Sequence, residues 1–337
     1  MSFNKTLPGP NDMVNRHICI VALCSLLRCS AQPEPCVTCP HYVKKTVDAP
    51  ARFLFIAGLE GSGHHSLSNM FAMCVRRRVL CRHDRELGQL LHGNRSHPTG
   101  IFVYGRQAAA DIAALRKRFF ARLQHLRDAP RDRGAPVLYL LNVNADGATI
   151  PDAGMMSYPN FGPPDKVLHH PDMQTLATMA EAAGADLRVL VVLRGARETL
   201  VSTSVHRLGE FPPWPEEAAV LGNSAAALAA ELALVDPRFV VCAPFAVATD
   251  PGAHRKAWAS RLGPALHPGL DDALVAVLAE GRAVDTTAVD KTRRAIPAAP
   301  PTPPGAYDPH VEHVEKMLGL VDAACRRRGG VYVEAEA

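Results

Sequence analysis

Several features that would assign this chain to a common class are missing from its sequence. It has no tract of lysine and arginine interleaved with aromatic residues, which is the pattern typical of nucleic-acid-binding surfaces. Its 37 basic and 33 acidic residues leave a formal net charge of only +4 over 337 residues. This small excess of positive charge is only a weak indication of an anionic ligand. We therefore do not predict a nucleic acid as a partner.

The N-terminal region lacks an apolar run long enough to cross a bilayer as a helix. The run from Ile18 to Leu27 has ten mostly apolar residues, whereas a spanning helix needs about 20. The basic Arg16 before it and the small residues up to Ala31 resemble a secretory signal. We predict a signal-like leader over residues 1–31. If this leader is not cleaved, it would be the only part of the chain that contacts a membrane. Because Arg28 follows the run directly, a buried or disordered N-terminal segment is the alternative.

The cysteine pattern lacks a second closely spaced pair. Five of the nine cysteines lie in the first 39 residues, and Cys36 and Cys39 have the spacing of a zinc or redox pair. No second pair follows at zinc-finger distance, so we predict no metal site. A disulfide in a lumenal stem, or no special role, fits these two residues better. Residues 32–50, with four prolines, are predicted to be that stem or a linker.

The most informative stretch of the sequence is a short apolar run followed by closely spaced glycines. Arg52 to Ala57 is too short for a helix and is rich in Phe, Leu and Ile, which predicts a buried strand. The glycines after it permit positive φ angles and close approach of the backbone to a ligand. If a helix begins just beyond them, its first amides form an anion site. The candidate binding residues are Gly58, Gly61, Ser62, Gly63, His64, His65 and Ser66.

The spacing of this turn is that of a phosphate-binding loop, because four residues separate Gly58 from Gly63. A nucleotide hydrolase would place Lys and Ser or Thr directly after the second glycine, but this chain has His64 and His65 there. A purely structural glycine turn is the alternative when the stretch is considered alone.

Beyond residue 52, short apolar runs alternate with longer helical patterns, which predicts an α/β fold. The expected arrangement is a parallel sheet of about five strands with helices on both faces, in one domain over residues 51–330. The segment 142–170 is too long for a passive connection and is predicted to be a functional loop. Strands are expected at 52–57, 101–104, 136–141, 187–193 and 239–242, and helices at 67–78, 108–127, 171–183, 197–207, 215–234, 254–262, 271–279 and 307–328.

A second candidate site lies where the strongest predicted strand ends. Arg194 follows that strand directly, and open α/β sheets bind ligands at this edge. Ser202 lies eight residues further on, so the hydroxyl and the guanidinium are able to share a phosphate if a helix begins near Ala196. The alternative for Arg194 alone is a surface side chain paired with Glu198.

Taken together, the two sites resemble those of the sulfotransferase superfamily. The 5′-phosphosulfate loop of that family reads Pro, Lys or Arg, Ser, Gly, Thr, Thr after the first strand, and Glu60 to His65 occupies this place. Its 3′-phosphate motif is an Arg that ends a later strand with a Ser eight positions downstream, as in Arg194 and Ser202. The chain is most similar to divergent members with a Gly-Leu-Glu-Gly-Ser/Thr-Gly-His-His loop and a Ser-Tyr-Pro segment, here Ser157 to Pro159.

This resemblance covers roughly residues 50 to 260 and implies a P-loop-like three-layer sandwich. It implies that 3′-phosphoadenosine 5′-phosphosulfate (PAPS) donates sulfonate, without a metal, to a hydroxyl or amine of a carbohydrate or protein, and that adenosine 3′,5′-bisphosphate (PAP) is released. Arg194 and Ser202 would hold the 3′-phosphate, and residues 61–66 the 5′ side. With the leader, the resemblance favours the secretory pathway and the Golgi lumen, with the cytoplasm as the alternative.

The chain departs from the family pattern at the residues that would perform catalysis. Gly61 stands where the family has a cation, so His64 is the candidate that stabilises the leaving oxygen. The alternative is that one histidine packs and the other bonds to the backbone. Glu60 is the preferred base for the acceptor, chosen over Asp84, Glu86, His92 and His97.

Two other functions remain open at this stage. A catalytically degenerate member of the family would keep the fold and bind a nucleotide or a partner without turnover. A magnesium-dependent kinase would need a loop Lys, a Ser or Thr after it and an Asp at a strand end. The loop has neither of the first two, and the strand over 136–141 is followed by Asn142.

Overall fold

The computed structural model describes residues 51–92, 100–101, 103–104, 112–129, 137–144, 154–155, 158–159, 168–169, 172–206, 214–295 and 308–334. The predicted leader (1–31) and stem (32–50), with Cys36 and Cys39, lie outside the described residues. So do Ser157, His97 and most of the segment 142–170 that we expected to be a functional loop.

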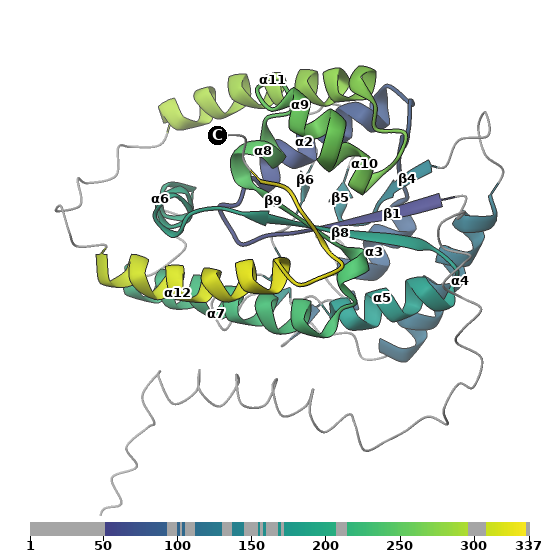
Figure 1. Cartoon of the computed structure of the whole chain (residues 1–337), viewed down its shortest axis with the longest axis horizontal. Helices are drawn as coiled ribbons and strands as arrows, with labels where there is room; N and C mark the ends of the chain where they lie inside the picture. Colours follow the sequence, from purple (N-terminus) through teal and green to yellow (C-terminus); the bar gives the residue numbers. More distant parts are fainter. Residues whose placement is uncertain are drawn as a thin grey trace, which may run out of the picture. The chain divides into compact units, whose positions relative to one another are not determined.

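The core of the domain is a six-stranded parallel sheet with the strand order β10-β9-β8-β1-β4-β2 (Figure 1). Strands β1 and β8 are central and pair in register from Arg52 with Asp186 to Ala57 with Val191. Since all six strands run in the same direction, their carboxyl ends lie at one edge of the sheet. The strands are β1 (Ala51–Ala57), β2 (Cys81–His83), β4 (Val137–Leu140), β8 (Asp186–Leu193), β9 (Val240–Pro244) and β10 (Val331–Tyr332).

Helices cover both faces of the sheet (Figure 1). Because successive side chains of a strand point to opposite faces, β1 contributes Phe53 and Phe55 to one apolar cluster and Leu54 and Ile56 to the other. A strand that is buried on both sides is a continuous apolar run, which explains the pattern of this stretch. The helices on the first side are α3 (Arg85–His92), α4 (Ile112–Asp128), α5 (Met173–Ala182), α7 (Trp214–Leu234) and α12 (Asp308–Cys325); those on the second are α2 (His64–Arg76), α8 (Phe245–Thr249), α9 (Arg255–Ala257), α10 (Gly263–Leu266) and α11 (Asp272–Ala295).

The α/β class, the parallel sheet and the helices on both faces are confirmed, and the main sheet has six strands where about five were expected. The strand expected at 101–104 is reduced to β3 (Val103–Tyr104), which pairs antiparallel with β7 (Leu168–His169) outside the main sheet. The two edge strands β2 and β10 were not predicted, because they are only three and two residues long and carry no apolar run. A further antiparallel pair joins β5 (Val143–Asn144) to β6 (Gly154–Met155).

Several helix boundaries agree with the signals in the sequence. Helix α2 ends at Arg76, a basic residue in the last turn, which suits a helix C-terminus. Asp172 is the N-cap of α5, where its carboxylate accepts a bond of 3.0 Å from the Thr175 amide. The helix expected at 271–279 instead continues to Ala295 as α11. The helix expected at 254–262 is divided into α9 and a π-helical turn, η7 (Trp258–Leu262).

Two disulfides that sequence reasoning did not predict tie the domain together. Cys74 on α2 is bonded to Cys81 at the start of β2. Cys242 on β9 is bonded to Cys325 at the end of α12, across 83 residues of sequence. All four cysteines are buried. Cross-links of this kind persist mainly in oxidising compartments.

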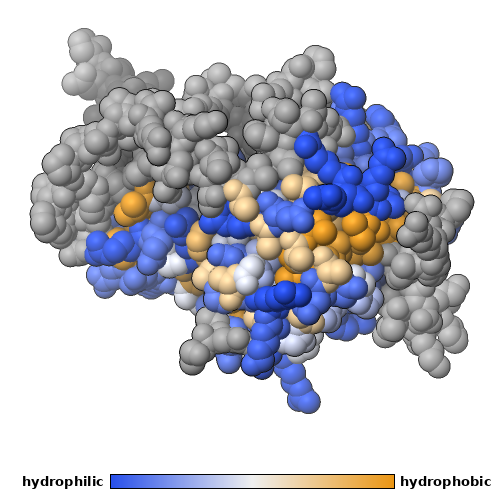
Figure 2. Space-filling view, turned by 90° about the horizontal axis from the view of Figure 1, so that it is seen from above, coloured by the Kyte–Doolittle hydropathy of each residue, from blue (hydrophilic) through white to orange (hydrophobic). Residues whose placement is uncertain are grey.

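One helix and a few surface side chains of the described part are notably apolar. Among the described helices, the stretch Glu217–Leu234 of α7 is long and apolar enough to cross a membrane, but half of it is buried in the domain, as in a core helix. Figure 2 shows apolar residues gathered over the middle and right of the visible surface, bordered by strongly hydrophilic ones. The exposed large hydrophobic side chains in the described part are Val79, Val201, Leu234, Leu320 and Val331.

Candidate functional site

The glycine turn connects the end of β1 to the start of α2 at the carboxyl edge of the sheet. Gly61 has a φ angle of 80° and Gly63 one of 87°, both in the left-handed region that favours glycine. Gly63 is also the N-cap residue of α2. The Ser62 amide closes the turn by donating to the Leu59 carbonyl at 2.9 Å. The turn therefore leads directly into a helix N-terminus, as the sequence predicted.

The two glycines are also required by close packing against neighbouring elements. A Cβ atom on Gly61 would lie 2.9 Å from the Thr199 carbonyl oxygen and 2.9 Å from the Thr203 hydroxyl, both on α6 (Ala196–His206). A Cβ atom on Gly63 would lie 2.5 Å from the Phe245 ring at the start of α8. The turn is thus held between α6 and α8.

Arg194 and Ser202 lie against this turn. The Arg194 guanidinium donates to the Gly61 carbonyl through Nη1 and is stacked over the Phe245 ring, with its Cζ atom 4.1 Å from the ring centroid. Ser202, half-buried on α6, has its Cβ atom 3.3 Å from the position that a Gly61 Cβ would take. Residues more than 130 positions apart in the sequence are therefore neighbours in the fold, as predicted.

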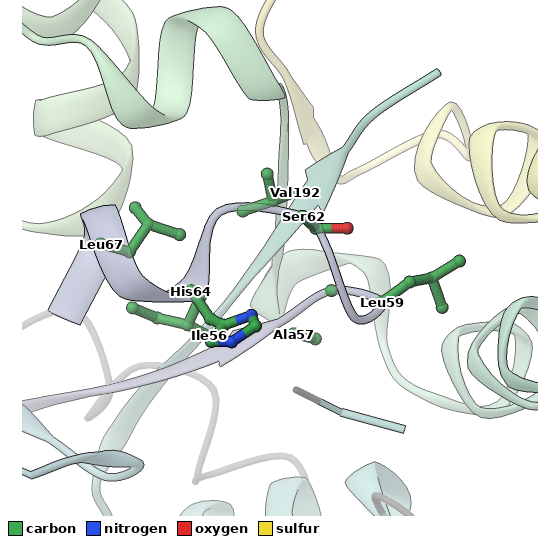
Figure 3. Close-up of a pocket in the computed structure, with 8 residues that line it drawn as sticks. Ile56, Ala57, Leu59, Ser62, His64, Leu67 and Val192 are labelled. Atoms are coloured by element: carbon green, nitrogen blue, oxygen red, sulfur yellow. The ribbon is translucent and has the colours of Figure 1, made fainter. Parts of the chain in front are cut away.

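The two histidines of the turn have different surroundings. The His64 side chain is buried and lines a small cavity with an empty volume of about 160 Å³, part of it open to solvent (Figure 3). Its Nε2 atom lies 3.4 Å from Oε1 of Glu60. His65 is exposed, and the centroids of the two imidazole rings are 4.4 Å apart. The other residues that line the cavity are Ile56, Ala57, Gly58, Leu59, Ser62, Leu67 and Val192.

The position of Glu60 favours a role beside His64. Its carboxylate faces the imidazole, and its backbone carbonyl accepts a long bond of 3.4 Å from the Thr203 hydroxyl. When the His64 imidazole is protonated on both nitrogens, the His64 and Glu60 side chains form an ion pair within the turn. The role of Glu60 as the base for an acceptor stays a prediction.

Two of the other acids considered as bases are engaged in structural contacts. Asp84 follows β2 and accepts from the Leu87 amide at 2.9 Å, at the start of α3, and from Nη2 of Arg122 at 2.6 Å. Burial acts to raise the pKa of Asp84, but the bonds from Arg122 and Leu87 outweigh it and hold that pKa below its usual value. Glu86 lies 3.6 Å from Arg118 and 3.5 Å from Arg122. The side chain of His92 is outside the described part, as is His97.

Tyr158, from the Ser-Tyr-Pro segment, lies beside the glycine turn. The Tyr158 and Gly58 backbones exchange two hydrogen bonds, each 3.1 Å long, in an isolated antiparallel bridge. The Tyr158 ring is fully buried and packs edge-on against Phe55 with centroids 5.1 Å apart, and burial raises the pKa of its phenol well above the ordinary value. Tyr158 thus anchors this segment to the first residue of the turn, through a contact that spacing alone did not reveal.

Asn142, which follows β4, has a structural role at the same edge. Its side-chain amide donates to the Ile56 carbonyl at 2.7 Å and accepts from the Ile56 amide at 3.0 Å, so it replaces a strand partner for β1. An Asp there would direct a carboxylate at the Ile56 carbonyl oxygen, which explains why the amide is suited to this position.

Sequence reasoning missed three residues that support the turn, through the Phe245 ring, the Thr203 hydroxyl and the Thr199 backbone carbonyl. Thr199 and Thr203 are four residues apart on α6, so helical spacing from Ser202 could have suggested that they face the same neighbour. Phe245 follows β9 directly, and the rule that parallel strands end at one edge could have placed it near Arg194.

No group of three or more metal-ligating side chains occurs among the residues that the structure describes. Comparison of the chain with protein-family models, with curated proteins and with solved structures found no match.

Proposed function

We propose that this protein is a sulfotransferase that moves the sulfonate of PAPS to a hydroxyl or amine of a carbohydrate or protein. The observation that carries this proposal is the meeting of Gly61, Arg194 and Ser202 at one edge of the sheet. A nucleotide with phosphates at its 3′ and 5′ positions needs two anion sites close together, and this edge supplies a helix N-terminus and a guanidinium. A P-loop-like three-layer sandwich is the finer fold that we propose with it.

The residues present fit the donor by their shape and charge. Gly61 and Gly63 adopt the left-handed conformation that lets the tight turn lead into α2 at Gly63. The amides at the start of a helix suit an anion such as the 5′-phosphosulfate. Arg194 and Ser202 would bind the 3′-phosphate through charge-assisted bonds of about 1.5 to 3 kcal/mol each. The amides of residues 61–66 would bind the 5′ side.

In the proposed reaction an oxygen or nitrogen of the acceptor attacks the sulfur, and the bond from sulfur to the bridging phosphate oxygen breaks. The acceptor loses a proton to a base, and adenosine 3′,5′-bisphosphate leaves. His64 would stabilise the negative charge that develops on the bridging oxygen. In the family a loop cation has this role, but this chain has Gly61 at that position. The Glu60 carboxylate, 3.4 Å away, would orient the imidazole and favour its charged form.

Thermal unfolding in the presence of nucleotides tests the proposed donor. We expect adenosine 3′,5′-bisphosphate to raise the melting temperature without metal, because it binds only the folded protein. If only ATP with Mg²⁺ raised the melting temperature, and the bisphosphate did not, the proposal would be wrong and a kinase would be favoured.

A catalytically degenerate member of the same family is the second candidate. It is favoured by the glycine turn, in which Gly61 stands in the place of the family's cation and the nearest imidazole is buried against Glu60. Transfer of labelled sulfonate from PAPS to a panel of glycans, peptides and small alcohols separates the two candidates. Bisphosphate binding with no labelled product on any acceptor would support the degenerate member.

We also propose that the protein works in the lumen of the secretory pathway, and the Golgi is the compartment that we expect. The two buried disulfides support this location, because thiols are kept reduced in the cytosol. Mass spectrometry of the protein from its native cells tests it: free thiols at Cys242 and Cys325 would favour the cytoplasm instead.

A further inference from the structure

Phe245 stands at the junction of the two anion sites, although no motif drew attention to it. Strands β8 and β9 pair with Leu193 opposite Pro244, so the next residue of each strand, Arg194 and Phe245, emerges at the same edge. The half-buried Phe245 ring touches the Gly63 backbone on one side and lies 4.1 Å from the Arg194 guanidinium carbon. One side chain therefore contacts both the loop and the arginine.

The support beneath Phe245 is rigid. Phe245 begins α8, and the next turn of that helix is held by Trp258, whose indole nitrogen donates to the Val247 carbonyl at 2.6 Å. Trp258 and Val247 are fully buried, and the Thr249 hydroxyl donates back to the Phe245 carbonyl at 2.7 Å. The ring is thus fixed in place by the core, whereas an arginine side chain has several rotatable bonds.

From this arrangement we propose that Phe245 is a positioning residue that holds the Arg194 guanidinium against the glycine turn. The face of an aromatic ring attracts a guanidinium and restricts it to the plane above the ring. With its Nη1 atom directed at Gly61, the guanidinium is kept beside the turn before a ligand arrives. Pre-orientation of this kind raises affinity because less side-chain entropy is lost on binding.

This inference rests on the proposed function, and it makes a narrower statement about the same site. Phe245 acts on the 3′-phosphate through Arg194, so it should affect a 3′,5′-bisphosphate far more than a 5′-monophosphate. A residue that merely packs against the turn would affect both ligands equally.

The test compares affinities for adenosine 3′,5′-bisphosphate and adenosine 5′-monophosphate, measured by calorimetry on the whole protein. For Phe245→Leu we expect the preference for the bisphosphate to fall roughly tenfold, because Leu fills the space beside Gly63 but has no ring face for Arg194. Phe245→Tyr keeps the ring face and should keep the preference within about twofold of the wild type.

The matched control is Phe239→Leu, at the other end of β9. Phe239 is 6% exposed and also has an arginine over its ring, with the Arg238 carbon 5.8 Å from the centroid. This variant should lose more stability than Phe245→Leu and keep the full preference for the bisphosphate.

Each outcome decides between the possible roles. Equal weakening of both ligands in Phe245→Leu, or no change in either, would overturn the positioning role while the proposed function stands. Loss of the preference in Phe245→Tyr as well would also overturn it, since the ring face is still present. A wild-type protein that shows no preference for the bisphosphate would overturn the proposed function, and the role of Phe245 with it.

Discussion

The two ends of the central strands β1 and β8 use arginine in different ways. At the amino end, Arg52 and Arg188 converge on the buried carboxylate of Asp186, with N–O distances of 2.5 Å for each. Both also donate to backbone carbonyls of α10, Arg52 to Leu266 and Arg188 to Ala265. At the carboxyl end, Arg194 is directed to the backbone of the glycine turn and to the Phe245 ring.

This difference in partners indicates that Arg52 and Arg188 have a structural role, whereas Arg194 is a candidate for ligand binding. At the amino end, two guanidiniums share one acid in a compact cluster that closes the sheet. At the carboxyl end, the guanidinium lies against the glycine turn that leads into the N-terminus of α2, and Ser202 packs beside the same turn. A guanidinium next to a helix N-terminus suits an anion. We therefore expect changes at the amino end to alter stability and changes at the carboxyl end to alter ligand affinity.

The largest expected effect breaks the amino-end cluster. Asp186→Ala should lower the free energy of unfolding by about 3 to 5 kcal/mol, because it leaves two largely buried guanidiniums without their shared acid. The measurement is urea denaturation at neutral pH. Asp272→Ala, which removes an exposed partner of Arg255 at 3.4 Å, is the control and should cost less than about 1 kcal/mol. If Asp186→Ala also changed the affinity of the remaining folded protein for adenosine 3′,5′-bisphosphate, the separation of the two ends would be wrong.

The next effect tests the backbone of the glycine turn. Gly63→Ala should destabilise the protein by about 2 to 3 kcal/mol, since the left-handed conformation is strained for alanine and the new methyl group would overlap the Phe245 ring. Thermal unfolding measures this change.

Gly319→Ala provides the contrast to Gly63→Ala. Gly319 lies within α12, and a Cβ added there meets no heavy atom within 4 Å. Alanine there should stabilise the protein by about 0.5 to 1 kcal/mol, because glycine is a poor helix former. A smaller loss for Gly63→Ala than about 1 kcal/mol would show that the turn adapts more readily than its φ angle indicates.

A third prediction sharpens the contrast between the arginines. Arg194→Ala should weaken binding of adenosine 3′,5′-bisphosphate about 10- to 100-fold, because one or two charge-assisted bonds are lost. Calorimetry measures the affinity, and a melting curve of the free protein should shift little. Arg188→Ala should show the reverse, with a lower melting temperature and unchanged affinity. Equal affinity losses in both variants would mean that Arg194 is not at the ligand.

The smallest effect concerns an acid at the carboxyl edge that the structure uses for stability. The pKa of Asp84 is held below its unfolded value, so its carboxylate stabilises the fold above that value and this contribution is lost as the pH falls through the folded pKa. Asp84→Asn should therefore be about 1 kcal/mol less stable than the wild type at pH 7. The two proteins should converge in acid. Unfolding curves between pH 2 and 7 would contradict this if the difference were independent of pH.

The inner part of the fold could be predicted because its signals are local. Strand β1 from Phe53 onward and strand β8 from Val189 onward are uninterrupted apolar runs, and the turn after β1 is marked by its glycines. Both strands and the edge where they end therefore follow from the sequence. The same edge rule led to Arg194 and Ser202. These residues needed no knowledge of distant contacts.

The remaining features depend on contacts between distant segments. The bond between Cys242 and Cys325 joins residues 83 positions apart, and nothing in either local sequence specifies the partner. The short strand β10 exists because β9 offers it an edge, and Asn142 takes a strand position because Ile56 lies opposite. The contact of Phe245 with Arg194 requires the register of β8 and β9.

The strand order has a consequence for how the chain is made. Strand β1 is the first strand of the described sheet to leave the ribosome, yet its neighbours β4 and β8 begin only at Val137 and Asp186. An apolar segment that contains Phe53, Phe55 and Ile56 must therefore be shielded while the rest is synthesised, since unpaired strands of nascent chains aggregate. The glycine turn, which is translated early, acquires its full surroundings only after residue 245 has emerged.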